Sequence, residues 1–145
     1  MRVKIVLLLA GIVAIFFFLL QKDSGNIVRM KIGDEIFTVR VAETQSERER
    51  GLSGTPALAQ SEGMLFEFPQ NGLHAIWMKD MLIPIDIVWL SDALSVIDLR
   101  ENVSPDSFPQ IFTPKSPASF VVELAAGAVK AFSIKEGSRV EIFAE

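Results

Sequence analysis

The first twenty residues divide the chain into two parts that must fold in different surroundings. Ile5 to Leu20 form sixteen consecutive uncharged, almost wholly apolar residues, preceded by Arg2 and Lys4. A run of this kind is typical of an export signal or a membrane anchor, and it does not contribute to a water-soluble core. The rest of the chain is roughly 120 residues long, which suffices for one domain that buries its own core.

Two interpretations of the apolar segment stay open. As a helix, Val3 to Leu20 reaches roughly 27 Å, close to the ~30 Å hydrocarbon core of a bilayer. Gln21 to Ser24 contain no A-x-A-like triplet for signal peptidase, and the chain has no cysteine for lipidation. We therefore expect residues 1–22 to be an uncleaved single-pass anchor, with cleavage near Ser24, and a secreted or periplasmic product, as the alternative. The positive-inside rule then places the N-terminus in the cytoplasm.

The predicted domain arrangement is a membrane segment at residues 1–22, a short linker at 23–26 and a single extracytoplasmic β domain at 27–145. Residues 23–145 carry eleven basic and eighteen acidic residues, a net charge of −7. An acidic surface repels phosphate backbones, so nucleic acid is not expected as a partner. The absence of cysteine excludes disulfides, thiolate ligands and a cysteine nucleophile, so packing alone must hold the fold.

Alternation of apolar and polar residues predicts mostly β structure in this domain. Val28 to Ile32 and Phe37 to Val41 alternate on either side of Gly33-Asp34, a strong hairpin signal. Thr44, followed three residues later by Glu47, is a capping-box pattern that predicts a short helix ending at Gly51. A second brief helical turn is expected after Pro56.

Further strands are expected along the second half of the chain. Asn71-Gly72 is a hairpin signal that predicts pairing of Met64 to Phe68 with Leu73 to Met78. The remaining predicted elements are a pair of strands at 85–90 and 96–99, a long surface loop at 102–117, a strand at 120–124, a short helix or turn at 125–132 and a terminal strand at 139–143. Together they predict a mainly β domain: an antiparallel sandwich or partly open barrel of six to eight strands with one or two short helices.

Several short blocks of sequence, in a fixed order and spacing, carry a resemblance to a known family. The blocks are Arg50-Gly51-Leu52, Gly63 to Phe66, Trp77-Met78-Lys79, Ile83 to Ile87, Glu123 to Gly127 and Gly137. From about Arg48 to Phe143 the chain resembles the bacterial and archaeal domain of unknown function 192. Ser53 and Asp80-Met81 depart from the family pattern, in which Met often follows Gly-Leu and Asn-Thr often follows the Lys. The resemblance implies a compact, mainly β domain, frequently behind an export signal, and assigns no activity or catalytic residue.

A candidate polar cluster for ligand binding or structural support comprises Arg50, Trp77, Lys79, Asp80, Asp86 and Glu123. Its three carboxylates are embedded in apolar sequence, where an ionised group is costly unless it is paired or hydrogen-bonded. In one interpretation they line a pocket with Lys79 and Arg50 and anchor a ligand or act as acid and base. In the other, which we favour, Asp86 and Glu123 accept backbone hydrogen bonds or pair with arginines to fix loops. Trp77 offers either a flat contact surface at a cleft or a core side chain.

Familiar catalytic and cofactor motifs are missing from the sequence. His74 is the one histidine, and its position beside the Asn71-Gly72 turn favours a solvent-facing or simply hydrogen-bonded ring over a catalytic or metal-binding one. The chain has no H-E-x-x-H, EF-hand, Walker or dinucleotide pattern. No catalytic residue, metal site or cofactor is therefore predicted.

Two functions from different classes fit these observations. The first is a membrane-tethered, non-catalytic module that binds an unknown cell-envelope ligand or protein in a cleft near Trp77 to Asp86. The second is a small envelope hydrolase or lyase, glycosidase-like, in which Asp80, Asp86 or Glu123 is the acid or base and Lys79 or Arg50 stabilises negative charge. Two carboxylates about 5 to 10 Å apart in an open cleft favour the second function, whereas carboxylates occupied by arginine or backbone donors favour the first.

Overall fold

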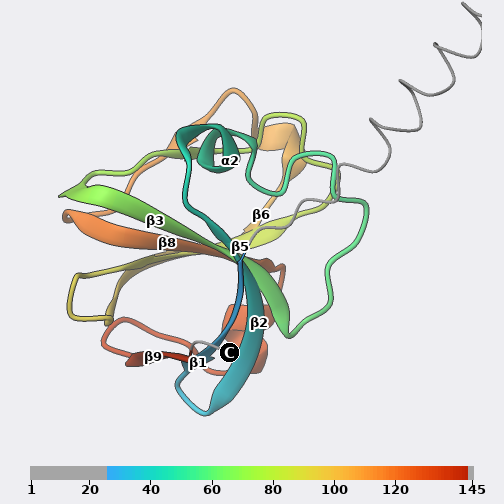
Figure 1. The fold of residues 1–145 in the computed structure, drawn as a ribbon. Helices are drawn as coiled ribbons and strands as arrows, with labels where there is room; N and C mark the ends of the chain where they lie inside the picture. The colour runs from blue at the N-terminus through green and yellow to red at the C-terminus, as the bar shows by residue number, and fades with distance from the viewer. Residues whose placement is uncertain (1–25, 144–145) are drawn as a thin grey trace, which may run out of the picture.

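The structure, a computed structural model, describes residues 26–143 (Figure 1). The predicted anchor at residues 1–22, and the linker except for Asn26, lie outside the described residues. Among the helices of the described part, none has the length and apolarity to cross a membrane.

Nine strands and three short helical segments make up the described residues. In chain order they are β1 (Ile27–Ile32), β2 (Glu35–Ala42), α2 (Gln45–Arg50), β3 (Glu62–Gly72), β4 (Ile76–Trp77), β5 (Ile85–Leu90), β6 (Val96–Val103), the 3-10 helix η1 (Pro105–Ser107), β7 (Ile111–Phe112), β8 (Ala118–Ala125), α3 (Ala128–Ala131) and β9 (Val140–Phe143). The predicted mainly β fold is confirmed.

Seven of the strands form one curled sheet in the order β6-β5-β8-β3-β2-β1-β9, and β4 and β7 form a separate two-stranded sheet. The large sheet bends into a half-barrel (Figure 1). Its two edges approach each other, because Ser95 forms an isolated bridge with Arg139 and the Val140 N–H donates to Leu94 O at 2.8 Å. A single curled sheet therefore takes the place of the predicted alternative of two packed sheets.

The local signals at the start of the domain predict its structure correctly. β1 and β2 pair as an antiparallel hairpin in which Ile32 lies opposite Glu35. The turn begins at Gly33, whose φ of +62° is a conformation that glycine adopts without strain. Helix α2 begins with the predicted capping box, in which Thr44 and Glu47 satisfy each other's backbone N–H groups, and ends at Gly51.

The prediction of a wholly antiparallel sheet is wrong at one pair of strands. β2 and β3 run parallel, with Val39 opposite Gly63 and Val41 opposite Leu65. A parallel pair needs a long crossover, which here consists of α2 and the irregular segment up to Ser61. The predicted helical turn after Pro56 is absent from that segment.

The prediction of a second hairpin at Asn71-Gly72 is also wrong. β3 continues through both residues, with a register shift against β8 between Glu67 and Gly72 that accommodates Pro69. Ile76 and Trp77 pair instead with Phe112 and Ile111 of β7. β7 lies within the segment 102–117, which was predicted to be a loop. Pairing with this distant strand takes the place of the hairpin that the local turn signal predicts.

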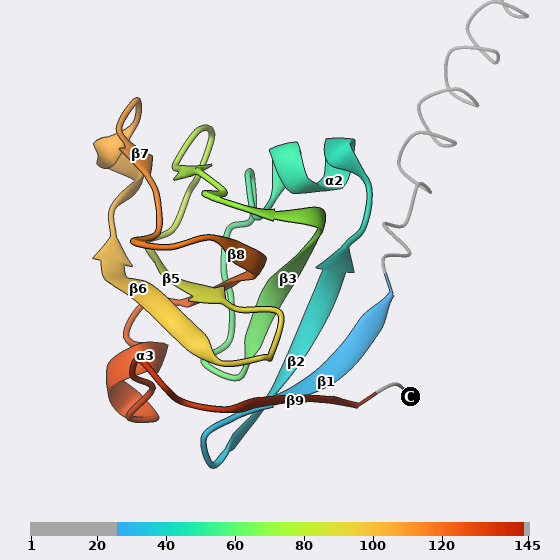
Figure 2. The same cartoon turned by 90° about the vertical axis from the view of Figure 1, so that its left-hand side faces the viewer.

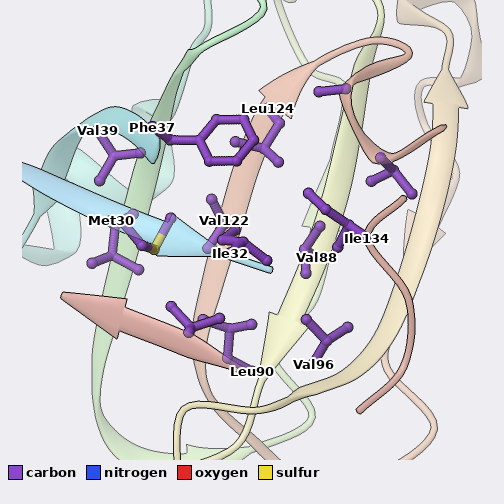
Figure 3. Close-up of a cluster of buried hydrophobic side chains, with 14 of the residues drawn as sticks. Met30, Ile32, Phe37, Val39, Val88, Leu90, Val96, Val122, Leu124 and Ile134 are labelled. Atoms are coloured by element: carbon purple, nitrogen blue, oxygen red, sulfur yellow. The ribbon is translucent and has the colours of Figure 1, made fainter. Parts of the chain in front are cut away.

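The large sheet buries apolar side chains on both faces. On one face, side chains from β1, β2, β5 and β8 meet Ile134, which follows α3; Figure 3 shows Phe37, Val88 and Leu124 in this cluster. On the other face, Phe66, Ile87, Trp89 and Val121 pack against residues from β4 and from the loops around it. The first face is covered in part by α3 and has a hollow of about 480 Å³ beside Val41, Leu65 and Phe120. The second face is covered mainly by loops and α2, which leave room for a pocket.

Candidate functional site

A pocket of about 330 Å³ opens on the face of the sheet that α2 and the loops cover. Residues of α2 and the segment after it, of β3, and of the small β4-β7 sheet line it. Figure 2 shows α2 and β7 at the same end of the molecule, and α3 and β9 at the opposite end. The volume lies within the range of about 300 to 1,000 Å³ that is usual for small-molecule sites.

The walls of the pocket are mostly apolar. The side chains of Phe66 and Phe68 come from β3, Ile76 from β4 and Ile111 from β7, and Leu52 and Met81 come from the connecting segments. Polar groups on the lining are few and are contributed mainly by α2 and the residues after it: Gln45, Arg48, Glu49, Arg50 and Ser53. An apolar pocket with a few polar groups is the usual form of a ligand-binding site.

Glu123 contributes a carboxyl group to this apolar lining. It lies on β8 in the centre of the sheet, opposite Met64 of β3 and Ile87 of β5, and its side chain is only 4% exposed. Among the described residues its carboxyl accepts one hydrogen bond, from the Leu52 N–H to Oε2 at 3.3 Å. Burial raises the pKa of this carboxyl to about 7, although the hydrogen bond from Leu52 acts in the opposite direction. Near neutral pH the group is therefore balanced between its acid and its carboxylate form.

The end of α2 approaches Glu123 closely because residue 51 is glycine. A Cβ at Gly51 would lie 3.2 Å from Phe66 Cζ and 3.3 Å from Glu123 Oε2, and the φ of +52° disfavours any other residue. The helix itself is attached to β3 by Arg48, which donates to Glu43 O and, at 2.9 Å, to Glu67 O and lies 5.4 Å above the Phe68 ring. Arg48 thus fixes one side of the pocket.

Trp77 and Lys79 lie at the mouth of the pocket. Trp77 is 45% exposed, lines the pocket and contacts Phe108 edge to face, with ring centroids 6.2 Å apart. The Lys79 ammonium lies 5.8 Å from the centroid of the Trp77 ring, but Lys79 does not line the pocket. Asp80 is exposed and adopts a φ of +56°; its carbonyl accepts the Gly54 N–H at 2.9 Å, so its role in the described structure is that of a turn residue.

Asp86 is buried on the opposite face of the sheet. Its two oxygens accept backbone N–H groups, Oδ1 from Asn102 and Oδ2 from Val129, both at 2.8 Å. These bonds connect β5 to the end of β6 and to α3. Asp86 is therefore placed as a structural anchor, at a distance from the pocket lining.

A further buried acid, Asp98 on β6, is absent from the predicted cluster. It accepts hydrogen bonds from Arg100 Nη1 at 2.7 Å and from the backbone N–H groups of Leu99 and Lys115, both at 2.9 Å. Burial acts to raise its pKa, but these donors outweigh burial and hold the pKa below its usual range. Strand alternation from Val96 does not predict this position, because a register shift between β5 and β6 places Asp98 opposite Trp89, on the other face of the sheet from Val96.

Of the six residues in the predicted cluster, the structure brings Arg50, Trp77 and Glu123 to the pocket, and places Lys79 at its edge and Asp80 and Asp86 elsewhere. Sequence reasoning missed the apolar walls from Phe66, Phe68 and Met81, because a core phenylalanine and a pocket phenylalanine have the same pattern. His74 stacks on Phe68 with ring centroids 3.6 Å apart, and its Nε2 lies 2.8 Å from Gln70 O. Within residues 26–143, no three His, Asp or Glu side chains are arranged to hold a metal ion.

Solved structures with the same fold are similar to this chain over most of its length. One is a protein from Sinorhizobium meliloti 1021 named as a candidate transcription regulator, with a TM-score of 0.80, 29% sequence identity, and coverage of 83% of this chain and 97% of that protein. Another, from Novosphingobium aromaticivorans, is a protein of unknown function with a TM-score of 0.78, 26% identity, and coverage of 83% and 89%.

Two relatives in sequence come from Thermococcus species. A UPF0127 protein of Thermococcus gammatolerans is 31% identical over 104 residues, and one of Thermococcus sibiricus is 30% identical over 105 residues. The matched regions cover 70% and 71% of this chain but 64% of each relative. The profile of the family DUF192, described as "uncharacterized ACR", matches residues 28–142. These matches show that the chain belongs to the DUF192 family of uncharacterised proteins.

Proposed function

We propose that this chain is a non-catalytic binding module of the cell envelope, tethered to the membrane by its N-terminal apolar segment with the β domain outside the cytoplasm. Its ligand is a small molecule with an apolar body and one hydrogen-bonding group. The single observation that carries the proposal is the apolar pocket of about 330 Å³ that contains the buried carboxyl of Glu123.

The size and chemistry of the pocket determine the kind of ligand. A water molecule occupies about 30 Å³ in the liquid, so the pocket has room for a ligand of roughly ten non-hydrogen atoms. Phe66, Phe68 and Ile76 offer such a ligand a hydrophobic surface, and burial of its apolar body supplies about 25 cal/mol per Å². The ligand body is therefore hydrocarbon or aromatic rather than a bare sugar.

Glu123 selects the polar group of the ligand. Its carboxyl accepts a single, long hydrogen bond among the described residues, so it retains capacity to bind a further group. As a carboxylate it pairs with an ammonium group, and as an acid it donates to a hydroxyl or carbonyl oxygen. A ligand that brings its own carboxylate next to Glu123 is repelled once Glu123 ionises.

Charge supports an envelope ligand over nucleic acid. Residues 23–145 have a net charge of −7, which repels a phosphate backbone. The name of the Sinorhizobium meliloti protein is a statement about that protein, and the charge of this chain gives no support for carrying it over.

A thermal-shift experiment with three matched amphiphiles tests the proposal. The full chain is melted at pH 8 with 1-octanol, n-octylamine or octanoate, which share a chain length and differ in the head group. A ligand that binds the native state at 100 times its Kd raises the free energy of unfolding by about 2.7 kcal/mol, or roughly 10 °C in Tm. We expect the amine to give the largest shift, the alcohol a smaller one and octanoate the smallest.

Two variants provide the controls. Ala75→Phe adds a ring to the lining of the pocket and should remove the shifts, whereas Ala131→Phe adds the same ring to the exposed end of α3 and should retain them. If none of the three compounds stabilises the wild-type chain, or if Ala75→Phe responds as strongly as Ala131→Phe, the pocket is not the binding site.

A glycosidase-like hydrolase is the second candidate function, and one observation favours it. A carboxyl with a pKa of about 7 is suited to act as general acid or base, and Glu49 supplies a second carboxylate on the pocket lining. Against it, Asp86 and Asp98 are occupied by backbone or arginine donors, as expected for structural acids. Release of nitrophenol from nitrophenyl glycosides by the wild-type chain, abolished in Glu123→Gln, would favour this function over simple binding.

A further inference from the structure

Exposed apolar side chains gather around the mouth of the pocket. Of the nine large hydrophobic residues that are exposed in the described part of the chain, five fall within residues 73–82 and 108–111: Leu73, Trp77, Leu82, Phe108 and Ile111. Trp77 lies opposite Ile111 in the β4-β7 pair and contacts the Phe108 ring. We call Trp77, Phe108 and Ile111 the apolar rim. A contiguous exposed group of this kind marks an interaction surface.

The described chain begins near the α2 wall of the pocket, across from this rim. Asn26 lies beside the residues that lead into α2, since its side chain donates to Glu43 Oε1 at 2.8 Å and its carbonyl accepts the Val41 N–H at 2.7 Å. Figure 2 shows the beginning of β1 on the same side of the molecule as α2, below that helix, with β7 on the far side. The start of the domain thus lies near α2, which forms one wall of the pocket, and the rim belongs to the wall across from it.

The length of chain before Asn26 limits how far the α2 wall can lie from a bilayer. The apolar segment ends at Leu20, and the six peptide steps from Leu20 to Asn26 span at most about 21 Å when fully extended. A domain of this length has a diameter of about 35 Å. If the apolar segment is embedded in the membrane, the tether is shorter than the domain and keeps the α2 wall of the pocket close to the lipid.

The chemistry of the rim fits the interfacial region of a bilayer. Tryptophan is enriched at that depth, where its ring contacts hydrocarbon and its N–H remains near water. Lys79, with its ammonium 5.8 Å from the Trp77 ring, has the long stem and charged end that reach toward headgroups. The acidic domain as a whole is repelled by anionic lipid, so attraction must come from apolar insertion and not from charge.

We propose that the apolar rim, Trp77, Phe108 and Ile111, docks on the surface of the bilayer that holds the N-terminal segment, so that the pocket opens toward the lipid and takes up amphiphiles from it. This inference rests on the membrane tether of the proposed function and adds the orientation of the domain and the source of the ligand. Docking depends on hydrophobic contact and is insensitive to salt.

Quenching of Trp77 by lipid tests the docking. The full chain is reconstituted in vesicles of zwitterionic phosphatidylcholine, with or without bromine atoms on the acyl chains, and tryptophan emission is recorded. The chain has two tryptophans, of which Trp89 is fully buried in the core. The emission of Trp77 is the difference between the wild-type chain and Trp77→Phe. We expect brominated lipid to remove most of this emission and to leave the emission of Trp89 unchanged.

A matched pair of variants isolates the rim. Phe108→Ser and Ile36→Ser each remove a side chain that is 45% exposed, but Ile36 lies at the start of β2, at the end of that strand remote from α2. Phe108→Ser should reduce the quenching of Trp77 by brominated lipid, and Ile36→Ser should leave it as in the wild-type chain. Equal quenching in the two variants would overturn the role of the rim.

Three other results overturn the proposal in distinguishable ways. If the chain sediments with vesicles but Trp77 is quenched by aqueous acrylamide and not by brominated lipid, the tether holds and the rim does not dock. If Trp77 is protected from both quenchers in a concentration-dependent way, a second copy of the chain covers the rim. If the chain stays in the supernatant, the tether and the docking fail together, while the amphiphile melting experiment still tests the pocket.

Discussion

Asp86 and Glu123 are acids on adjacent strands, buried on opposite faces of the same sheet, and they differ in how many hydrogen bonds their carboxyl groups accept. Asp86 is fully buried, and each of its oxygens accepts a backbone N–H at 2.8 Å. Glu123 is 4% exposed and, among the described residues, accepts one N–H at 3.3 Å beside an open pocket. A buried carboxylate whose hydrogen bonds are complete stabilises the fold; one that is incomplete and faces a cavity is available to a ligand.

The two acids also differ in what covers them. Asp86 is covered by α3, whose first turn donates the Val129 N–H to that carboxylate (Figure 3 shows the adjoining core). The face of Glu123 is covered by α2 and by irregular segments that leave the pocket open. The acid with two short hydrogen bonds thus lies under α3, and the acid with one long hydrogen bond lies beside the pocket that α2 and the loops line.

The largest predicted loss of stability is at Asp86. Asp86→Asn replaces an acceptor with an NH₂ group that meets a backbone N–H, so one charged hydrogen bond is lost and two donors face each other. We expect the free energy of unfolding to fall by about 3 kcal/mol and Tm by roughly 10 °C, measured by thermal and urea denaturation. Unchanged melting combined with lost ligand binding would instead assign Asp86 to the functional site.

Replacing Glu123 should raise the stability of the fold, by an amount that depends on pH. The pKa of Glu123 is about 7 in the folded chain against 4.5 in the unfolded chain, so ionisation of this group costs stability as pH rises from 4.5 to 7. Glu123→Gln removes that cost. We expect the variant to exceed the wild-type chain by about 3 kcal/mol at pH 8 and to match it near pH 4.5. Urea denaturation at both pH values measures the difference, and a pH-independent difference would contradict the pKa.

Asp98 provides an internal reference for that pH dependence. Its pKa is held below the usual value, so it contributes stability above the unfolded pKa, near 3.9, and this contribution is lost as pH falls through the lower folded value. The stability of the wild-type chain should therefore fall as pH drops below about 4, because of Asp98, and as pH rises above 4.5, because of Glu123. Asp98→Asn should reduce the decline on the acid side, to which Glu47 also contributes because the capping box lowers its pKa, without altering the response of Glu123.

A smaller effect is expected where α2 meets Glu123. Gly51→Ala and Gly33→Ala both place a Cβ at a positive φ, +52° and +62°, but the new methyl group contacts Phe66 and Glu123 in the first and nothing within 4 Å in the second. We expect Gly51→Ala to cost about 2 kcal/mol and Gly33→Ala about 1 kcal/mol. Binding of octylamine, measured by calorimetry, should weaken in Gly51→Ala alone. Equal loss of affinity in both variants would argue against a narrow pocket at this position.

The smallest expected change in stability is at Trp77, at the mouth of the pocket. Trp77→Phe changes a side chain that is 45% exposed, so the free energy of unfolding should change by less than about 0.5 kcal/mol. Intrinsic fluorescence of the wild-type chain should respond to octylamine, and that of Trp77→Phe, which retains only the buried Trp89, should not. A full response in the variant would place the ligand near Trp89.

The parts of the fold that depend on neighbouring residues were predictable from the sequence. The β1-β2 hairpin and the capping box of α2 each rest on a few adjacent side chains, and the 85–90 and 96–99 pair is joined by a short turn. The parallel pairing of β2 with β3 and the pairing of β4 with β7 depend on chain segments far apart, for which local patterns carry no information. The misread Asn71-Gly72 turn shows that a strong local signal yields to long-range pairing.

The candidate site was predictable in its polar residues and not in its shape. Carboxylates embedded in apolar sequence stand out, which led to Glu123 and Asp86 together, but sequence does not state which acid has complete hydrogen bonds. That distinction depends on the Asn102 and Val129 N–H groups, which the fold brings to Asp86 from distant parts of the chain. Asp98 was not predicted, because its position depends on a register shift between β5 and β6 that places it opposite Trp89.

The ionisation of Glu123 tests the central claim most directly. The ¹³Cδ resonance of Glu123, assigned by its loss in Glu123→Gln, can be followed by NMR from pH 4 to pH 9. A midpoint close to 7 is the result expected for a buried carboxyl with incomplete hydrogen bonding, facing an apolar pocket. A midpoint near 4.5 would mean that the carboxyl is solvated or fully hydrogen-bonded in solution, and the contrast between the two acids would be lost.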